Sequence, residues 1–245
     1  MTLLKPILYF SLFKYPLTEE EIFNFSKAES KEQIKLDLME LVNDDIIYKI
    51  DNFYLTENNE TLIKRRLEGN KMAKNIYQKA LTVSRLISKF PYVEGVGISG
   101  SLSKGYYDDD GDIDFFIITS PKRLWIARTF LILYKKLFLL NSRKYFCVNY
   151  FISSNALEIE EKNIFTATEL TTLLPMFGNG SFHKFYDKNK WVESYLPNKT
   201  VTDGLSKLNL VKKPTVTKIT EYFLDSKIGD WLDAAFLRIT YKKWK

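Results

Sequence analysis

The sequence predicts a two-part α/β protein of the α+β type: a small helical module, then a core of mixed β-sheet flanked by helices, then a helical C-terminal region. With 245 residues, 45% of them hydrophobic and 15% aromatic, the chain can bury one large core or two modest ones. Strand-like apolar runs lie between residues 93 and 153, with helix-like segments on both sides. The charge is also divided. Residues 1–60 carry six lysines, no arginine and twelve acids, whereas the remainder carries 30 basic and 18 acidic residues.

The composition excludes several classes of protein. A single cysteine, Cys147, rules out an internal disulfide, and its apolar neighbours favour a buried hydrophobic role over a nucleophilic one. The apolar start of the chain lacks the cleavage pattern of a signal peptide. The longest apolar stretch, 124–140, contains Arg128, Lys135 and Lys136, which predicts a buried helix rather than a membrane span. We expect a cytoplasmic protein with no membrane partner.

Residues 1–60 have the pattern of a winged-helix domain. Thr18 precedes three glutamates and Ser30 precedes apolar residues at helical spacing, so each is the expected N-cap of a helix. Two strand-like runs flank residues 51–52 and predict a hairpin. The expected elements are helices over 6–13, 18–25 and 30–41 and strands over 46–50 and 53–55.

The charge of this module argues against binding to duplex DNA. Such binding draws much of its free energy from lysine and arginine side chains that neutralise phosphates. The candidate recognition helix instead carries Glu32, Asp37 and Glu40 against two lysines. We therefore expect the module to pack, to dimerise or to present a substrate rather than to read DNA. The sequence leaves open whether two copies form a homodimer.

The rest of the chain divides into a helical linker over 61–90, a core over 91–155 and a helical C-terminal region over 156–245. In the linker, apolar residues recur at helical intervals among charged ones. Prolines punctuate the C-terminal region. The expected elements are strands over 93–99, 112–119 and 145–153, a short helix after residue 100, a helix over 122–140, helices for most of the remainder and a last amphipathic helix or pair over 218–241.

The residues suited to chemistry are concentrated in residues 96–119. A Gly100-Ser101 turn follows one apolar run, and Asp112 and Asp114 enter another. Side chains on a strand alternate between faces, so the two carboxylates would point the same way while Ile113 enters the core. Two carboxylates on one face repel each other unless a cation lies between them. Hard oxygen ligands at this spacing suit Mg²⁺ or Mn²⁺ carrying a nucleoside triphosphate.

Two other glycine motifs do not fit this segment. Gly95, Gly97 and Gly100 match the dinucleotide-binding pattern, but the helix of about three turns that such a unit requires has no room before the next strand. Gly100 and Gly105 have the glycine spacing of a P-loop, but Tyr106 stands where that motif needs lysine.

Gly100-Ser101, ten intervening residues and Asp112-Ile113-Asp114 together resemble the DNA polymerase β-type nucleotidyltransferase superfamily, over roughly residues 90–155. The resemblance implies that Gly100 and Ser101 hold the β- and γ-phosphates of an NTP and that Asp112 and Asp114 bind the metal. It also implies transfer of an NMP group to a hydroxyl acceptor, with release of pyrophosphate. Free N–H groups at a helix start attract anions in any case. Ser103 and Lys104 could add phosphate contacts, and a solvated role for Lys104 is equally open.

One position departs from the superfamily pattern. The third carboxylate of the family comes from a later strand, where this chain has Asn149. An amide can coordinate Mg²⁺ but brings no charge and cannot act as a general base. Either Asn149 is a neutral ligand beside another acid, or it binds nucleotide or substrate, or the protein is a nucleotide-binding regulator with weak or no activity. A plain hydrogen-bonded amide is a further reading. The acids nearest in sequence are Glu158, Glu160 and Glu161.

Residues further downstream could close over a nucleotide base, although none has a diagnostic spacing. One histidine and one cysteine in the whole chain exclude a zinc site in practice. The sequence does not specify whether the acceptor is a small molecule, a protein or an RNA end. The downstream residues are Glu169, His183, Lys184, Lys188, Lys190 and Trp191.

Overall fold

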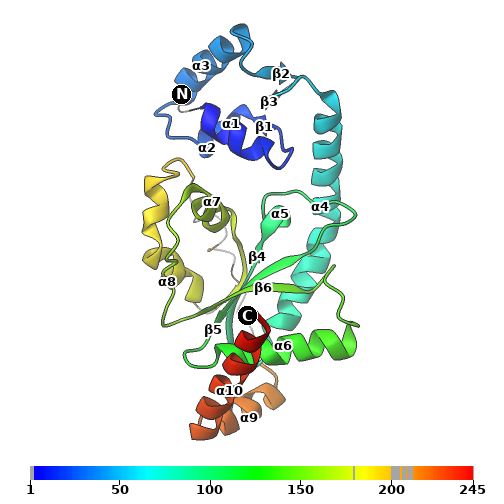
Figure 1. Cartoon of the computed structure of the whole chain (residues 1–245), viewed down its shortest axis with the longest axis vertical. Coiled ribbons are helices and arrows are strands. Elements are labelled where there is room, and N and C mark those ends of the chain that lie inside the picture. The colour runs from blue at the N-terminus through cyan, green and yellow to red at the C-terminus, as the bar shows by residue number, and fades with distance from the viewer. Residues whose placement is uncertain (1–2, 179, 200–204, 206–207, 209–211, 245) are drawn as a thin grey trace.

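The computed structural model describes residues 3–178, 180–199, 205, 208 and 212–244. It is a mixed α/β structure with two small sheets, as predicted at this level. Figure 1 shows three levels along the long axis: the N-terminal elements at one end, the larger sheet in the middle and the last two helices at the other end. No helix in the described ranges is both long and apolar enough to cross a membrane.

Residues 3–55 form three helices and a three-stranded antiparallel sheet. Thr18 and Glu21 make a capping box, in which the Glu21 N–H donates to the Thr18 hydroxyl and the Thr18 N–H donates to the Glu21 carboxylate at 2.9 Å. Ser30 caps the next helix through its hydroxyl, as predicted. The predicted helices and hairpin are confirmed, with small shifts at their ends. The elements are α1 (Leu4–Ser11), β1 (Leu17–Thr18), α2 (Glu19–Asn24), α3 (Lys31–Asn43), β2 (Tyr48–Ile50) and β3 (Phe53–Leu55), and the strand order is β1-β3-β2.

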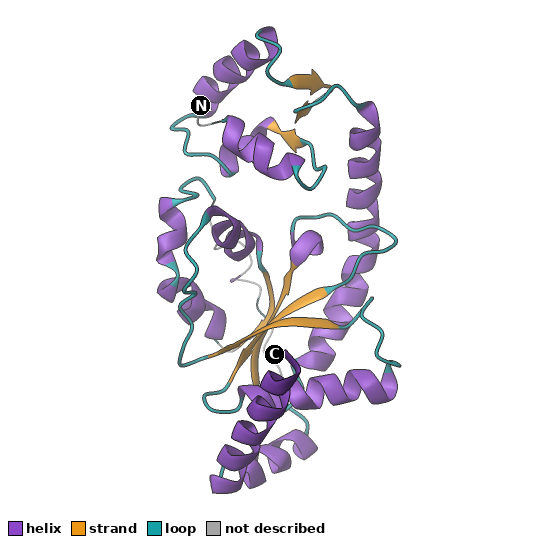
Figure 2. Ribbon diagram, viewed as in Figure 1, coloured by secondary structure: helices purple, strands orange, loops and turns teal. Residues whose placement is uncertain are grey.

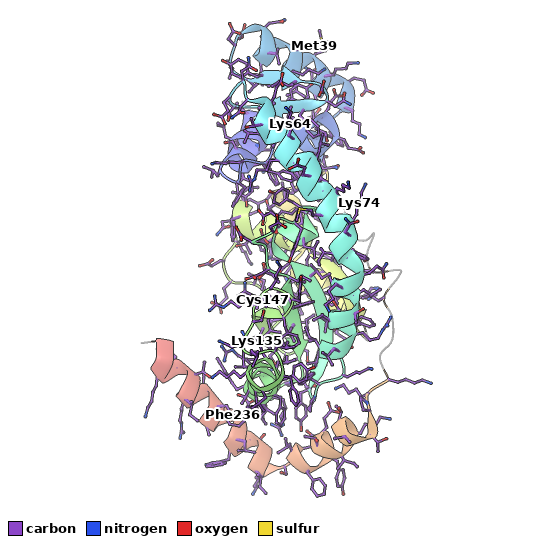
Figure 3. All side chains as sticks on the ribbon, turned by 90° about the vertical axis from the view of Figure 1, so that its right-hand side faces the viewer. Met39, Lys64, Lys74, Lys135, Cys147 and Phe236 are labelled. Carbon is purple, nitrogen blue, oxygen red and sulfur yellow. The ribbon has the colours of Figure 1, made fainter. Side chains whose placement is uncertain are left out.

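The predicted linker is one long helix, α4 (Glu60–Ile87), which runs from the N-terminal elements along the larger sheet (Figure 3). The buried Arg66 guanidinium donates to both carboxylate oxygens of Glu21, at 2.6 and 2.9 Å, and also to the carbonyl of Pro16. One turn further on, the Asn70 amide donates to the Gly105 carbonyl at 2.5 Å. The helix therefore holds the N-terminal elements against the core.

The remaining elements form the core and the C-terminal region. They are β4 (Val93–Ser99), α5 (Gly100–Ser103), β5 (Asp114–Thr119), α6 (Leu124–Phe138), β6 (Cys147–Ser153), α7 (Ile164–Thr172), β7 (Leu174–Gly178), α8 (Ser181–Lys188), η1 (Lys190–Ser194), α9 (Thr215–Leu224) and α10 (Lys227–Trp244). Within the predicted helical C-terminal region, residues 200–204, 206–207 and 209–211 lie outside the described residues.

The larger sheet has the strand order β6-β5-β4-β7 (Figure 2). Strands β5 and β6 are parallel and the other pairs are antiparallel, so the sheet is mixed, as predicted. Alternate residues of β5 enter two different clusters. Phe115 and Ile117 pack with residues of α4 and α6, whereas Phe116 and Ile118 pack with residues of α7 and α8. Helices therefore cover both faces of this sheet.

The expectation of helices after residue 153 missed one strand. Leu174–Gly178 forms β7 and pairs with β4 at the edge of the sheet. Pro175 made the segment look unlike a strand, because proline cannot donate a ladder hydrogen bond. An edge strand tolerates this residue, since one of its sides has no partner strand.

The last two helices confirm the predicted C-terminal pair, and Figure 3 shows them extending sideways from the body. They pack on α6, where Leu232 and Phe236 contact a small cluster that contains Ile126. The prediction of a buried α6 was only partly correct. Its start is buried, but Leu137 and Phe138 at its end are exposed, because no described element covers that turn.

Candidate functional site

The Gly100-Ser101 turn joins β4 to the short helix α5. Gly100 has a φ of +68°, which residues with a side chain rarely adopt, and a Cβ built on it would lie 2.4 Å from Oδ2 of Asp114. Only glycine can adopt this backbone conformation and also leave room for the Asp114 carboxylate. Ser101 is exposed beside the turn, whereas the buried Ser103 donates its hydroxyl to the Gly100 carbonyl at 2.8 Å. The turn therefore brings backbone against the Asp114 carboxylate and leaves Ser101 open to a ligand.

Asp112 and Asp114 lie at the start of β5. Ile113 between them is fully buried, as the predicted alternation requires. The ladder begins only at Asp114, so the predicted strand start at residue 112 was wrong. Ile113 still bonds toward β6: its N–H donates to the Lys144 carbonyl at 3.0 Å, and its carbonyl accepts from the Cys147 N–H at 3.1 Å.

The electrostatics of Asp114 reflect a partly buried site with several acids. Burial is the main cause that raises the pKa of Asp114 above its ordinary value, and the charges of Asp112 and Glu169 raise it further. Hydrogen bonds from the Cys147 thiol and the Asn149 amide act in the opposite direction. Burial, followed by the charge of Asp114, raises the pKa of Cys147 to about 11, so this thiol is neutral at pH 7. That state agrees with the expectation that Cys147 is not a nucleophile.

Asn149 reaches the acid pair through an irregularity in β6. Phe115 pairs with Val148 and Phe116 pairs with Tyr150, which leaves Asn149 as the extra residue of a bulge. The side-chain amide of Asn149 donates to Oδ1 of Asp114 at 3.1 Å. Asn149 is therefore next to Asp114 in space.

Glu169, on α7, is a further acid close to the turn. Its carboxylate pairs with Nζ of Lys104 at 2.7 Å, and both side chains are mostly buried. The same ammonium donates to the Gly100 carbonyl at 3.0 Å. Lys104 is therefore not a solvated surface lysine, which was one of the two roles that the sequence left open for it. From the sequence, Glu169 could be named only as one of several downstream residues. No spacing rule relates a residue on a later helix to the acid pair.

The acids nearest to Asn149 in sequence have other neighbours. Glu158, Glu160 and Glu161 are all exposed, and Glu158 pairs with Lys162 at 2.6 Å. The charges acting on Asp114 are instead those of Asp112 and Glu169.

The other downstream residues lie on or beside α8. Three of them, His183, Lys184 and Lys188, are exposed on that helix. Lys190 pairs with Asp187 at 3.3 Å. Trp191 donates from its indole nitrogen to Asn189 at 3.1 Å.

A cavity of about 450 Å³ opens beside the Gly-Ser turn. Its walls come from α1 and the segment after it, from α4, from α5 and the loop that follows, and from α7. Gly100, Ser101, Lys104 and Glu169 all contribute to it. The volume falls in the range of about 300–1,000 Å³ that is typical of small-molecule sites. No local pattern could predict this cavity, since its walls are distant in sequence.

The acid pair suits a metal ion that arrives with further ligands. Within the described ranges, no group of three or more histidine, cysteine, aspartate or glutamate side chains converges to hold an ion. Mg²⁺ is commonly bound by one or two carboxylates together with waters and substrate phosphates. Two carboxylates alone do not form a closed metal cage, so an ion at Asp112 and Asp114 would need waters or phosphate oxygens as further ligands.

Comparison with known proteins gives no assignment: no family model, no curated protein and no solved structure matches this chain.

Proposed function

We propose that this protein is a metal-dependent nucleotidyltransferase of the DNA polymerase β type, which transfers an NMP group from an NTP to a hydroxyl acceptor and releases pyrophosphate. The observation that carries the proposal is the contact of Gly100 with Asp114. The two halves of the motif are separated in sequence but adjacent in space, and the third expected position, Asn149, donates a hydrogen bond to the same carboxylate.

In this proposal Asp112 and Asp114 hold Mg²⁺ or Mn²⁺, which when bound supplies charge stabilisation for the triphosphate. Gly100 and Ser101 lie against the β- and γ-phosphates. The acceptor oxygen forms a bond to the α-phosphorus, the bond from that phosphorus to the bridging oxygen breaks, and pyrophosphate leaves. The acceptor proton passes to water or to a nearby carboxylate.

Glu169 is the acid best placed for the role that Asn149 cannot fill. Its charge acts on Asp114, and it lines the cavity beside Gly100. It is also held in place by Lys104. We therefore favour Glu169 over the acids nearest to Asn149 in sequence as the group that takes the proton of the acceptor hydroxyl.

The N-terminal elements have the order helix, strand, helix, helix and hairpin, which supports a winged-helix-like module. Glu32 and Glu40 are exposed on α3, so this helix presents acids where a DNA reader needs cations. On the side of the core, the Tyr15 hydroxyl donates to the Lys104 carbonyl at 3.0 Å. We propose that the module covers the site rather than binding duplex DNA.

A second candidate is a nucleotide-binding regulator with weak or no activity. The observation that favours it is the amide of Asn149, which occupies the place of a carboxylate. Such a protein would bind a metal–nucleotide complex through the same residues and signal to DNA or to a partner protein through its N-terminal module.

The reaction is tested with NTPs labelled at either the α- or the γ-phosphate, incubated with the purified protein, Mg²⁺ or Mn²⁺ and a lysate of the source cell. NMP transfer predicts that the α-label enters a new product, whereas the γ-label leaves in pyrophosphate. A γ-label in the product would show phosphoryl transfer and contradict the proposal. Metal-dependent nucleotide binding without any transfer would favour the regulator.

A further inference from the structure

The cavity beside the Gly-Ser turn is lined by six aromatic rings. They come from three separate parts of the chain, namely α1 with the segment after it, the loop after α5, and α7. Aromatic side chains bind flat ring systems by stacking, and this interaction tolerates any base because every base has a π-face. The rings are those of Tyr9, Phe10, Phe13, Tyr15, Tyr106 and Phe165.

The charged residues of the cavity are paired with one another. Arg65 lies 3.6 Å from Asp108, and its guanidinium is 5.2 Å from the centre of the Tyr106 ring. Lys104 is paired with Glu169 at 2.7 Å. Two cations thus face two anions, so the lining carries no net formal charge. A neutral aromatic ligand matches this wall better than an anionic one, because it displaces no ion pair.

The cavity is continuous with the proposed phosphate site. Gly100 and Ser101 line it, and Gly100 is also the residue in contact with Asp114. A molecule whose phosphates lie at the Gly-Ser turn would therefore place its other end near the aromatic rings. An NTP has this construction, with a charged triphosphate at one end and a neutral heterocycle at the other.

We propose that this cavity binds the nucleobase of the NTP, stacked on side chains from α1, from α7 and from the loop that contains Tyr106. The inference rests on the proposed function, since the triphosphate anchors the base. It assigns to the N-terminal module a direct part in nucleotide binding, through Tyr9, Phe13 and Tyr15. It also predicts that recognition of the base is tolerant of its identity, because stacking rather than a fixed hydrogen-bond pattern holds it.

The test compares two ligands that share the phosphates and differ in the base. One is an NTP in which a methylene group replaces the α,β-bridging oxygen, and the other is inorganic tripolyphosphate, each titrated calorimetrically with Mg²⁺. The variants are Phe13→Ala and Phe165→Ala, whose side chains are 54% and 52% exposed and so contribute little to the core. Tyr222→Ala is the control, because Tyr222 is 80% exposed on α9.

We expect each cavity variant to weaken binding of the NTP analogue about 10-fold, which is about 1.4 kcal/mol, and to leave binding of tripolyphosphate unchanged. The control should bind both ligands as the wild type does. If both cavity variants bind the analogue as the wild type does, or lose affinity for both ligands equally, the base does not lie in this cavity. If the wild-type protein binds neither ligand, the proposed function fails first, and this assignment fails with it.

Discussion

Gly100 and Asp114 are in direct contact, because a Cβ on Gly100 would lie 2.4 Å from Oδ2 of the Asp114 carboxylate. Gly100 also has a φ of +68°, so the turn needs glycine for its backbone conformation as well. The turn and the acid pair are therefore one structural unit. A side chain added at Gly100 would therefore displace the Asp114 carboxylate.

Gly100→Ala should therefore cost about 1–2 kcal/mol of folding free energy through the left-handed backbone alone, and it should also displace Asp114. We expect NMP transfer to fall about 10-fold or more, in line with the cost of small displacements in a catalytic site. Gly180→Ala is the matched control, because Gly180 has a φ of +80° but no neighbouring atom within 4 Å of the methyl group that alanine would add. Both variants should lose the backbone cost in urea unfolding, and Gly100→Ala should lose more, because its methyl group also overlaps the Asp114 carboxylate. Equal transfer by the two would contradict the role given to the contact.

Asn149→Asp tests whether a carboxylate at position 149 contributes to metal binding. Without metal, this variant replaces an amide donor 3.1 Å from Asp114 with a like charge, so its melting temperature in a chelator should fall below that of the wild type. With Mg²⁺ and NTP the difference should shrink or reverse, because a third carboxylate adds affinity for the ion. A melting temperature that responds to Mg²⁺ no more than that of the wild type would count against a metal at this place.

Glu169→Gln separates the two candidate sources of a third acid. If Glu169 activates the acceptor, its loss should lower the transfer rate about 100-fold, within the range for general bases, and change NTP affinity much less. Glu161→Gln should leave both quantities near wild type, since Glu161 is exposed and its charge is not among those that act on Asp114. Equal rates in the two variants would remove Glu169 from the mechanism.

Arg66→Ala should detach the N-terminal elements from α4. The Arg66 and Glu21 side chains are 6% and 27% exposed, and removing one partner of such a pair costs about 3–5 kcal/mol. The control is Glu20→Ala, in the exposed pair of Lys31 with Glu20, where a loss of less than about 1 kcal/mol is expected. Urea unfolding measures both costs, and limited proteolysis should cut near α4 in the Arg66 variant alone. Resistance of that variant to proteolysis would contradict the docking described for α4.

Features encoded by neighbouring residues could be predicted from the sequence. The Thr18 and Ser30 caps depend on residues within one helical turn, and the strand over 93–99 follows from Val93, Val96 and Ile98 within one short run. Ile113 is buried between the two acids, as predicted, although it lies one residue before the strand begins. Each of these needed no knowledge of the rest of the chain.

Features made by tertiary packing could not be predicted. The bulge at Asn149 depends on how β6 aligns with β5, and the approach of Glu169 depends on where α7 packs. The cavity forms only because α4 places the N-terminal elements opposite α5. For β7, the local signal pointed the wrong way, since Pro175 is compatible with a strand only at a sheet edge.

The acid pair is central to the proposed function, and the double variant Asp112→Asn, Asp114→Asn tests its role most directly. The variant replaces two mutually repelling carboxylates by amides of the same shape, so the fold should stay intact. Its unfolding midpoint should lie at or above that of the wild type, because burial and the charge of Asp112 already disfavour the charge on Asp114. In the α-label assay we expect transfer to fall at least about 100-fold, since the metal no longer has its carboxylates. A folded double variant that transfers NMP at the wild-type rate would contradict the central claim.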